Sequence, residues 1–245
     1  MAQPFLSVVI PAYNEEPRIQ RTLDRVTEYL STRQYLWEVV VSDDGSTDNT
    51  YALVELASSE NPNIRLLTLP HRGKGWAVKN AMLAATGDYR LICDADLSVP
   101  IEQVERLLPP RLEGVDIALG SREQPGSRRI GEPTLRHVMG RVYNRLVRSL
   151  TAPGLKDTQC GFKCFRGDIV SQLFQLQTMD GFAFDAELLF LAHRRGLTVK
   201  EVGIDWYYGE GSKVRPVRDS LSMTGDLLKI RWAYLMGRYS GAGLG

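Results

Sequence analysis

Residues 6–15 read LSVVIPAYNE, an apolar run rich in valine and isoleucine that ends in polar residues. Two later stretches repeat this arrangement, WEVVVSDDGSTD at 37–48 and YRLICDAD at 89–96. Between the first two, Ile19, Leu23, Val26 and Leu30 recur at helical spacing, so one face of a helix can pack on a sheet. The alternation predicts an α/β fold whose first half is Rossmann-like, with a mostly parallel sheet and helices on both faces.

The same patterns place elements along the whole chain. We expect strands at Leu6–Ile10, Trp37–Ser42, Ile64–Leu69, Tyr89–Asp94, Asp116–Gly120, Cys160–Phe165 and Thr198–Ile204. We expect helices over 19–30, Asp48–Ser59, Gly75–Ala85, Ile101–Leu108, Phe182–Arg195 and Arg218–Tyr239. Ser121–Ser149 holds seven arginines against two glutamates and shows no strand pattern. No GxGxxG follows a strand, so a dinucleotide fingerprint is not predicted.

Length and composition fit one globular unit. The chain has 245 residues, 43% of them hydrophobic, and a net charge of +1, so a bulk charge excess for nucleic acid is absent. The arginine-rich segment also lacks interleaved aromatic residues for base stacking, apart from Tyr143. We expect a single domain over 1–245, made of a first half (1–120), a second half (121–217) and a C-terminal amphipathic helix with its tail (218–245).

The apolar runs bear on location. They are far shorter than the roughly 20 residues that a membrane-spanning helix needs, and the start lacks the features of an export signal. Cys93, Cys160 and Cys164 form an odd, sparse set in apolar surroundings, which is typical of reduced core thiols. We therefore expect a cytoplasmic protein without disulfides or a zinc site.

Acidic residues follow three of the predicted strands. The carboxyl ends of parallel strands meet at one edge of a sheet, where ligands bind. Carboxylates gathered there repel one another unless a cation or N–H donors offset them, so the pattern favours a divalent metal and a ligand with N–H groups. Asp43, Ser46 and Asp48 have a second interpretation, as turn and helix-cap residues, and for Asp48 the cap is favoured because a helix follows directly.

In this order, PAYNE, DDGSTD and DADLS resemble the inverting family-2 glycosyltransferases of the GT-A fold. QCGFK (159–163), FDAE (184–187) and GSKV (211–214) narrow the resemblance to the polyprenyl-phosphate sugar transferases, above all the dolichyl-phosphate glucosyl- and mannosyltransferases. It covers essentially the whole chain. It implies transfer of a hexose, glucose before mannose, from a nucleotide diphosphate sugar to a polyprenyl phosphate, with residues 1–120 binding the donor and 121–217 the acceptor.

The resemblance also implies donor-binding residues. These are Pro11, Ala12, Tyr13, Glu15, Ser42, Asp44, Asp94, Ala95 and Asp96. Asp44 is expected to accept a hydrogen bond from the base, and Tyr13 offers a face for the ring. Asp94 and Asp96 are the expected ligands of Mg²⁺ or Mn²⁺, although Ser98 stands where some mannosyl relatives carry a glutamine ligand. Lys74, between two glycines, is expected either at the donor phosphates or as a solvated surface lysine.

The acceptor side needs positive charge. A lipid phosphate is already ionised at pH 7, so cations matter more than a strong base. Arg122, Arg136 and Lys213 match family positions that hold phosphates, and Arg128 and Arg129 are expected helpers. For the remaining arginines of the segment, at 141, 145 and 148, a solvated helix face is expected. Asp185 is either a base or carboxylate at the anomeric side or a helix cap.

Two rivals remain at this point. One is the same fold acting on a soluble hydroxyl acceptor, for which Asp185 becomes an obligatory base. The other is a nucleotide-sugar-binding module without turnover. The sequence leaves open the choice between UDP-glucose and GDP-mannose.

The final helix bears on membrane contact. It carries Leu221, Leu228, Trp232 and Leu235 on one stripe, with basic residues nearby. We expect peripheral attachment to the cytosolic membrane face, and the alternative is that this stripe packs on the sheet as core.

Overall fold

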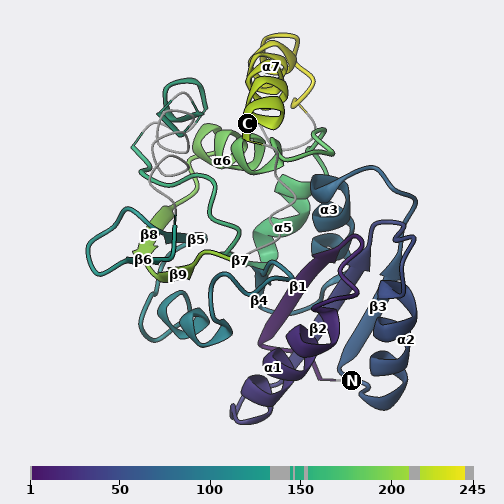
Figure 1. Cartoon of the computed structure of the whole chain (residues 1–245). Helices are drawn as coiled ribbons and strands as arrows, with labels where there is room; N and C mark the ends of the chain where they lie inside the picture. The colour runs from purple at the N-terminus through teal and green to yellow at the C-terminus, as the bar shows by residue number, and fades with distance from the viewer. Residues whose placement is uncertain (1, 133–143, 146, 152–153, 210–215, 241–245) are drawn as a thin grey trace.

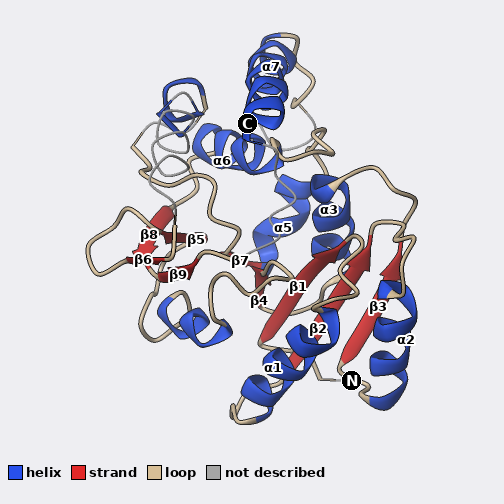
Figure 2. Ribbon diagram, viewed as in Figure 1, coloured by secondary structure: helices blue, strands red, loops and turns tan. Residues whose placement is uncertain are grey.

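The computed structural model describes residues 2–132, 144–145, 147–151, 154–209 and 216–240, with side chains of the last range described from Thr224 onward. A seven-stranded sheet runs through the molecule in the order β3-β2-β1-β4-β7-β5-β8 (Figures 1 and 2). Its strands are β1 (Leu6–Ala12), β2 (Trp37–Asp43), β3 (Ile64–Thr68), β4 (Tyr89–Ile92), β5 (Ile117–Ser121), β7 (Lys163–Arg166) and β8 (Val199–Gly203). Strands β1 to β4 are mutually parallel, and β7 is antiparallel to both β4 and β5.

The sheet is covered on both faces because its strands are apolar on both sides. In β1, Val8 and Ile10 pack with the helices α1 (Ile19–Ser31) and α2 (Thr50–Glu60) and the 3₁₀ helix η1 (Ile101–Arg106). Val9 points to the other face, onto α3 (Lys74–Ala84), α5 (Gly167–Phe174) and α6 (Phe184–Arg194). The last helix, α7 (Pro216–Leu235), packs beside α6 (Figure 1). Helices therefore cover both faces of a mostly parallel sheet, as predicted for a GT-A-like fold.

Some predicted elements differ from those observed. The arginine-rich segment, predicted to lack strands, contributes β6 (Arg128–Ile130), which pairs in parallel with β9 (Asp205–Tyr207) in a second small sheet. The predicted helix at 101–108 is the shorter 3₁₀ helix η1, ahead of Pro109 and Pro110. Strand β7 begins at Lys163 instead of Cys160, and α5 occupies a segment for which no element was predicted. Short pairings of three residues give too little periodicity to be detected in a sequence.

The three cysteines are buried and free, as predicted. Burial raises the pKa of the Cys160 thiol to about 11 and that of Cys164 to about 12. Thiols of this kind stay protonated at neutral pH and are poor nucleophiles.

No helix in the described part of the chain has the length and hydropathy to cross a membrane.

Candidate active site

The ends of β1, β2 and β4 lie side by side at one edge of the sheet (Figure 2). Ala12, the last residue of β1, is in register with Asp43 at the end of β2, and the next N–H, that of Asp44, donates to the Ala12 carbonyl at 2.8 Å. Residues 94–96 follow β4, which pairs with the other side of β1. The three polar motifs therefore meet, as their strand-end positions predict.

Asp44 stabilises the loop 71–73, which leads into α3. Its buried carboxylate accepts hydrogen bonds from the N–H groups of Arg72 (3.0 Å) and Gly73 (2.8 Å), and Nδ1 of His71 lies 2.8 Å from its Oδ2. The His71 ring in turn stacks on Tyr13, with centroids 4.0 Å apart and planes 17° apart. An aromatic pair thus lies beside a buried carboxylate at the predicted base-binding position. The structure also gives this carboxylate a second role, which is to hold the loop 71–73.

The other predicted donor residues line the same edge. Pro11 and Ala12 end β1, and the Ser42 hydroxyl is fully buried, with no hydrogen-bond partner among the described residues. The Glu15 carboxylate pairs with Arg18 at 3.0 Å. Asp48 accepts the N–H of Thr50, the first residue of α2, at 3.0 Å, but the N-cap position itself is held by Asn49, so Asp48 supports the helix start from one residue earlier than predicted.

Lys74 and Asp94 form an ion pair at the centre of the edge. Lys74 begins α3, and its Nζ lies 2.6 Å from Asp94 Oδ1. Burial disfavours the charged ammonium, but the carboxylates of Asp94, Asp185 and Asp96 outweigh that cost and raise the pKa of Lys74. Lys74 is therefore a fixed cation next to the predicted metal ligands and not a solvated surface lysine.

A second ion pair lies next to the first and is more deeply buried. Lys163 in β7 is 1% exposed, and its Nζ donates to Asp185 Oδ1 at 2.6 Å and to the Cys160 carbonyl at 2.5 Å. Asp185 lies in the first turn of α6. Burial raises the pKa of Asp185 although the ammonium groups of Lys163 and Lys74 act against it. Asp185 thus faces the cation cluster, and no side-chain cap hydrogen bond is found at the start of α6.

Gly161 brings the two pairs together. Its Cα packs directly on the Asp94 carboxylate, so that a Cβ there would lie 2.7 Å from Asp94 Cγ and nearer still to Oδ2. The QCGFK segment therefore supplies both a glycine that admits Asp94 and a lysine that pairs with Asp185. Sequence reasoning quoted this motif but missed Lys163. The available signal was a lysine inside an apolar strand, because a buried lysine needs a charged partner.

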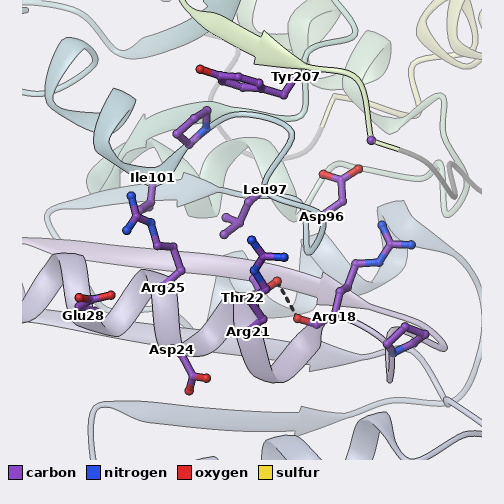
Figure 3. A pocket seen from close by; sticks show the side chains of 13 residues that line it. Arg18, Arg21, Thr22, Asp24, Arg25, Glu28, Asp96, Leu97, Ile101 and Tyr207 are labelled. Carbon is purple, nitrogen blue, oxygen red and sulfur yellow. Dashed lines mark hydrogen bonds between the residues drawn. The ribbon is translucent and has the colours of Figure 1, made fainter. Parts of the chain in front are cut away.

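Asp96 lies on the outer side of this cluster, where it is exposed. Its Oδ1 accepts the Ser98 N–H at 2.9 Å. Asp96 lines one end of a pocket of about 870 Å³ between α1, the loop after β4 and the end of β9 (Figure 3). Arg21 and Arg25 from α1, and Arg18 directly before that helix, line it too, and the sequence did not predict this pocket. Arginines at spacings of three and four residues were the available signal.

The carboxylates present fit a divalent ion only together with a ligand. Among the described residues, no group of three or more His, Cys, Asp or Glu side chains is arranged to hold a metal. The predicted ligands Asp94 and Asp96 would supply two carboxylates, and Mg²⁺-type ions are commonly held by one or two carboxylates plus substrate phosphates.

The predicted acceptor arginines are engaged in ion pairs. Arg122 donates to both oxygens of the buried Asp157 at 2.7 and 2.8 Å, and its guanidinium lies 5.3 Å from the Trp206 ring centre. Arg128 pairs with Asp205, and Arg129 with Glu123. Arg122 is thus held rigidly, with its charge already partnered. Arg136 and Lys213 lie outside the described residues.

The remaining arginines of the segment differ from one another. Arg145 is exposed, as expected for a solvated face, whereas Arg148 is partly buried and its Nε has no hydrogen-bond partner among the described atoms. The third, at position 141, is outside the described residues.

Comparisons with known proteins agree with the resemblance that these motifs indicate. Residues 7–174 match the family described as Glycosyl transferase family 2. The chain is 35% identical over 247 residues to the dolichyl-phosphate beta-glucosyltransferase of Dictyostelium discoideum, covering 95% of this chain and 76% of that protein. It is 36% identical to the Mus musculus enzyme of the same name, covering 96% and 77%.

Solved structures agree in fold. Glucosyl-3-phosphoglycerate synthase from Mycobacterium tuberculosis in complex with UDP superimposes with a TM-score of 0.67 at 23% identity, over 99% of this chain and 82% of that one. The same enzyme with Mn²⁺, UDP and glucosyl-3-phosphoglycerate gives 0.63 at 23% identity, with the same coverage. At these identities the likeness concerns the fold.

Proposed function

The chain belongs to glycosyl transferase family 2, and from this premise we propose that it transfers glucose from UDP-glucose to a polyprenyl phosphate of the dolichyl type, with inversion at the anomeric carbon. The proposal rests on two neighbouring ion pairs, Lys74–Asp94 and Lys163–Asp185. The QCGFK motif supplies Lys163 and the FDAE motif supplies Asp185, so both motifs meet the strand-end residues at one edge of the sheet. The named relatives, similar over nearly the whole chain, are glucosyltransferases acting on dolichyl phosphate, which supports the same substrates here.

The donor lies along the edge of the sheet. The uracil ring packs on the Tyr13–His71 pair, and the Asp44 carboxylate accepts its N–H. The diphosphate then extends towards Lys74, whose raised pKa keeps its ammonium charged beside phosphate oxygens. UDP in the solved neighbour supports uridine over guanosine.

Asp94 and Asp96 would hold Mg²⁺ or Mn²⁺ once the donor phosphates are bound. Such an ion, when bound, offsets the negative charge on the departing nucleoside diphosphate. A solved neighbour binds Mn²⁺ together with UDP-glucose, which supports this use of the two carboxylates. Lys74 adds a second positive charge on the same side, fixed by α3.

The acceptor phosphate attacks from the opposite side of the sugar. It needs no base because it is ionised, so Asp185 acts as a fixed carboxylate, oriented by Lys163, that stabilises positive charge developing at the anomeric carbon. The arginine and lysine at 136 and 213 provide positive charge for the acceptor phosphate, and Arg122, whose charge Asp157 already partners, adds only its remaining N–H groups.

The enzyme works at a membrane surface. Its acceptor remains in the bilayer because each CH₂ exposed to water costs about 0.8 kcal/mol. Helix α7 presents the exposed apolar side chains that contact the lipid, among them Trp232 and Leu235. The cytosolic face is supported by the three free cysteines, because disulfides form mainly in oxidising compartments.

Mass spectrometry of the lipid product tests the proposal. Purified protein is incubated with a short polyprenyl phosphate, Mn²⁺ and either UDP-glucose or GDP-mannose, and a parallel reaction offers 3-phosphoglycerate as a soluble hydroxyl acceptor. We expect a hexosyl-phosphoryl-polyprenol from UDP-glucose only. Product on the soluble acceptor alone, accompanied by complete loss of activity in Asp185→Asn, overturns the proposal in favour of a hydroxyl-directed transferase.

A further inference from the structure

Glu187 is a second carboxylate of α6, and none of its surface is exposed. It accepts hydrogen bonds from the Thr178 N–H (2.9 Å), the Thr178 hydroxyl (2.6 Å) and the Met179 N–H (2.9 Å). The Tyr239 hydroxyl donates to the same carboxylate at 2.7 Å. A buried charge with this many donors is stable, but it has no contact with Asp94 or Lys74 and no part in the chemistry proposed above.

The residues that Glu187 holds form the loop 177–181, which packs on the first turn of α3. Gln177 Nε2 donates to the Gly75 carbonyl at 2.8 Å, and the Trp76 N–H donates to the Asp180 carbonyl at 3.1 Å. Arg72 pairs with the Asp180 carboxylate at 2.5 Å. The loop therefore contacts the chain on both sides of Lys74.

The two glycines beside Lys74 complete this contact. A Cβ at Gly73 would lie 2.7 Å from the Asp180 carbonyl oxygen, and a Cβ at Gly75 would lie 2.8 Å from that of Gly181. Gly73 also has φ +129, which side chains rarely adopt. The Gly-Lys-Gly turn is thus shaped to fit against loop 177–181, and its position depends on that loop.

From these contacts we infer that Glu187 is a positioning residue for the donor: it fixes loop 177–181, and the loop fixes Lys74 beside Asp94. The inference rests on the proposed role of Lys74 at the donor diphosphate. It explains why FDAE carries two carboxylates two residues apart. Positions i and i+2 of a helix point in different directions, so Asp185 faces Lys163 while Glu187 faces the loop and Tyr239.

Glu187→Gln tests this role, with Glu38→Gln as the matched control. Gln has nearly the same size as Glu, but its amide N–H₂ group would replace one carboxylate oxygen and face backbone N–H donors from which it cannot accept a hydrogen bond. Glu38 is also a buried carboxylate with several donors, Ser7, Thr86 and Arg65, but it lies at the start of β2, at the amino end of the sheet. Both variants are expected to lose stability, and only Glu187→Gln is expected to disturb Lys74.

Two readouts separate positioning from general damage. The first is UDP affinity by calorimetry with Mn²⁺ present, where Glu187→Gln should bind about ten-fold more weakly and Glu38→Gln as the wild type does. The second is the rate at which an amine-reactive reagent labels Lys74, measured by mass spectrometry relative to the exposed Lys229. It should rise several-fold in Glu187→Gln without any donor present, so it tests the inference even if UDP is not the donor.

Milder variants cover the case in which Glu187→Gln does not fold. Thr178→Val removes one hydroxyl donor to Glu187 and should raise Lys74 labelling and the KM for the donor, with little change in the KM for the acceptor. Thr178→Ser restores the hydroxyl and should restore both values. Unchanged Lys74 labelling and donor affinity in Thr178→Val would overturn the inference. If the wild type did not transfer sugar to polyprenyl phosphate, but Lys74 labelling and UDP affinity still changed in the variants as expected, only the proposed function would be contradicted.

Discussion

At the scale of single residues, the approach of Gly161 to Asp94 controls the geometry of the site. Gly161→Ala would place a Cβ 2.7 Å from Asp94 Cγ, and the carboxylate would have to move away from Lys74. We expect kcat/KM for glucosyl transfer to fall about 10²-fold, since displacements near 1 Å have effects of this size.

The matched control for this substitution is Gly225→Ala. Gly225 is exposed in α7, and its Cβ would meet nothing within 4 Å. It should keep full activity and gain up to about 1 kcal/mol in the free energy of unfolding, because alanine favours helix. Steady-state kinetics and urea titration check both variants. Wild-type kcat/KM in folded Gly161→Ala would show that Asp94 has no fixed place in catalysis.

The buried pair Arg122–Asp157 governs stability in acid. Burial alone would raise the pKa of Asp157, but the Arg122 guanidinium outweighs it and holds that pKa well below its usual range. A carboxyl with a lowered folded pKa contributes stability that is complete above its unfolded pKa, near 3.8, and is lost as pH falls towards the folded pKa.

Asp157→Asn should therefore lose about 3–5 kcal/mol at pH 7, because Arg122 is left without its counter-charge. The wild type should lose stability steeply below about pH 4, and the variant less steeply. Urea unfolding at a series of pH values measures both slopes. Parallel acid slopes in the two proteins would mean that the pair is not the source of the acid sensitivity.

Sequence reasoning found carboxylates better than their partners. Asp94 and Asp185 were predicted from strand-end position and motif, because such patterns are local. Lys163 and His71 were missed because their roles depend on contacts across the fold, with Asp185 and with Tyr13 and Asp44. The pairing of Arg122 with Asp157 was hidden for the same reason, since 35 residues separate them in sequence.

At the scale of elements, α7 carries the surface that we propose contacts a membrane. Its inner side buries Leu227, Ile230 and Ala233, whereas Trp232 is 54% and Leu235 78% exposed. The alternative that the predicted stripe packs as core is therefore wrong for its described members, which face outward. Exposed basic residues, Lys229, Arg231 and Arg238, lie around them. An apolar stripe flanked by basic groups suits an anionic lipid surface.

Trp232→Glu should weaken binding to vesicles of anionic lipid by roughly 1.5–3 kcal/mol, the value of burying one large apolar side chain. Leu56→Glu is the matched control, because Leu56 is also 54% exposed but belongs to α2. Flotation of each variant at low and high salt measures the effect. Equal flotation of the two variants, or none for the wild type at low salt, would rule out α7 as the contact.

Elements of the first half were predictable because each has a long, regular pattern. β1 and β2 differ from their predicted bounds by one or two residues at the carboxyl end, where the polar motifs begin. β6 and β9 were not predicted, since a strand of three residues is defined by its partner and not by its own sequence. The helix α5, of eight residues, was not predicted either.

At the scale of the whole molecule, one sheet joins the predicted halves. β5, which ends at Ser121, pairs with β7 and β8 from the second half, and β7 pairs in turn with β4 from the first. Lys163 and Asp185 from the second half thereby meet Lys74 and Asp94 from the first. Division into a donor half and an acceptor half remains a prediction, and the proposed reaction takes place where the two meet.

Such an arrangement predicts that donor and metal stabilise the fold together. UDP that binds only the folded chain should add about 2.7 kcal/mol to the free energy of unfolding at 100 times its Kd, a rise of about 5–10 °C in Tm for a chain of this size. The effect should need Mn²⁺ or Mg²⁺, because Asp94 and Asp96 would otherwise face the diphosphate as bare negative charges. Chelation should remove most of the rise.

Asp96→Ala should abolish the dependence on metal, whereas Asp88→Ala, an exposed aspartate at the amino end of β4, should retain it. Thermal unfolding with UDP, with Mn²⁺ and with both, for the three proteins, separates the contributions. If UDP alone gave the full rise in the wild type and metal added nothing, the diphosphate would have to be neutralised by Lys74 and arginines without an ion. The two carboxylates after β4 would then serve to hold Lys74 in place, and the reaction would rest on fixed side-chain charges.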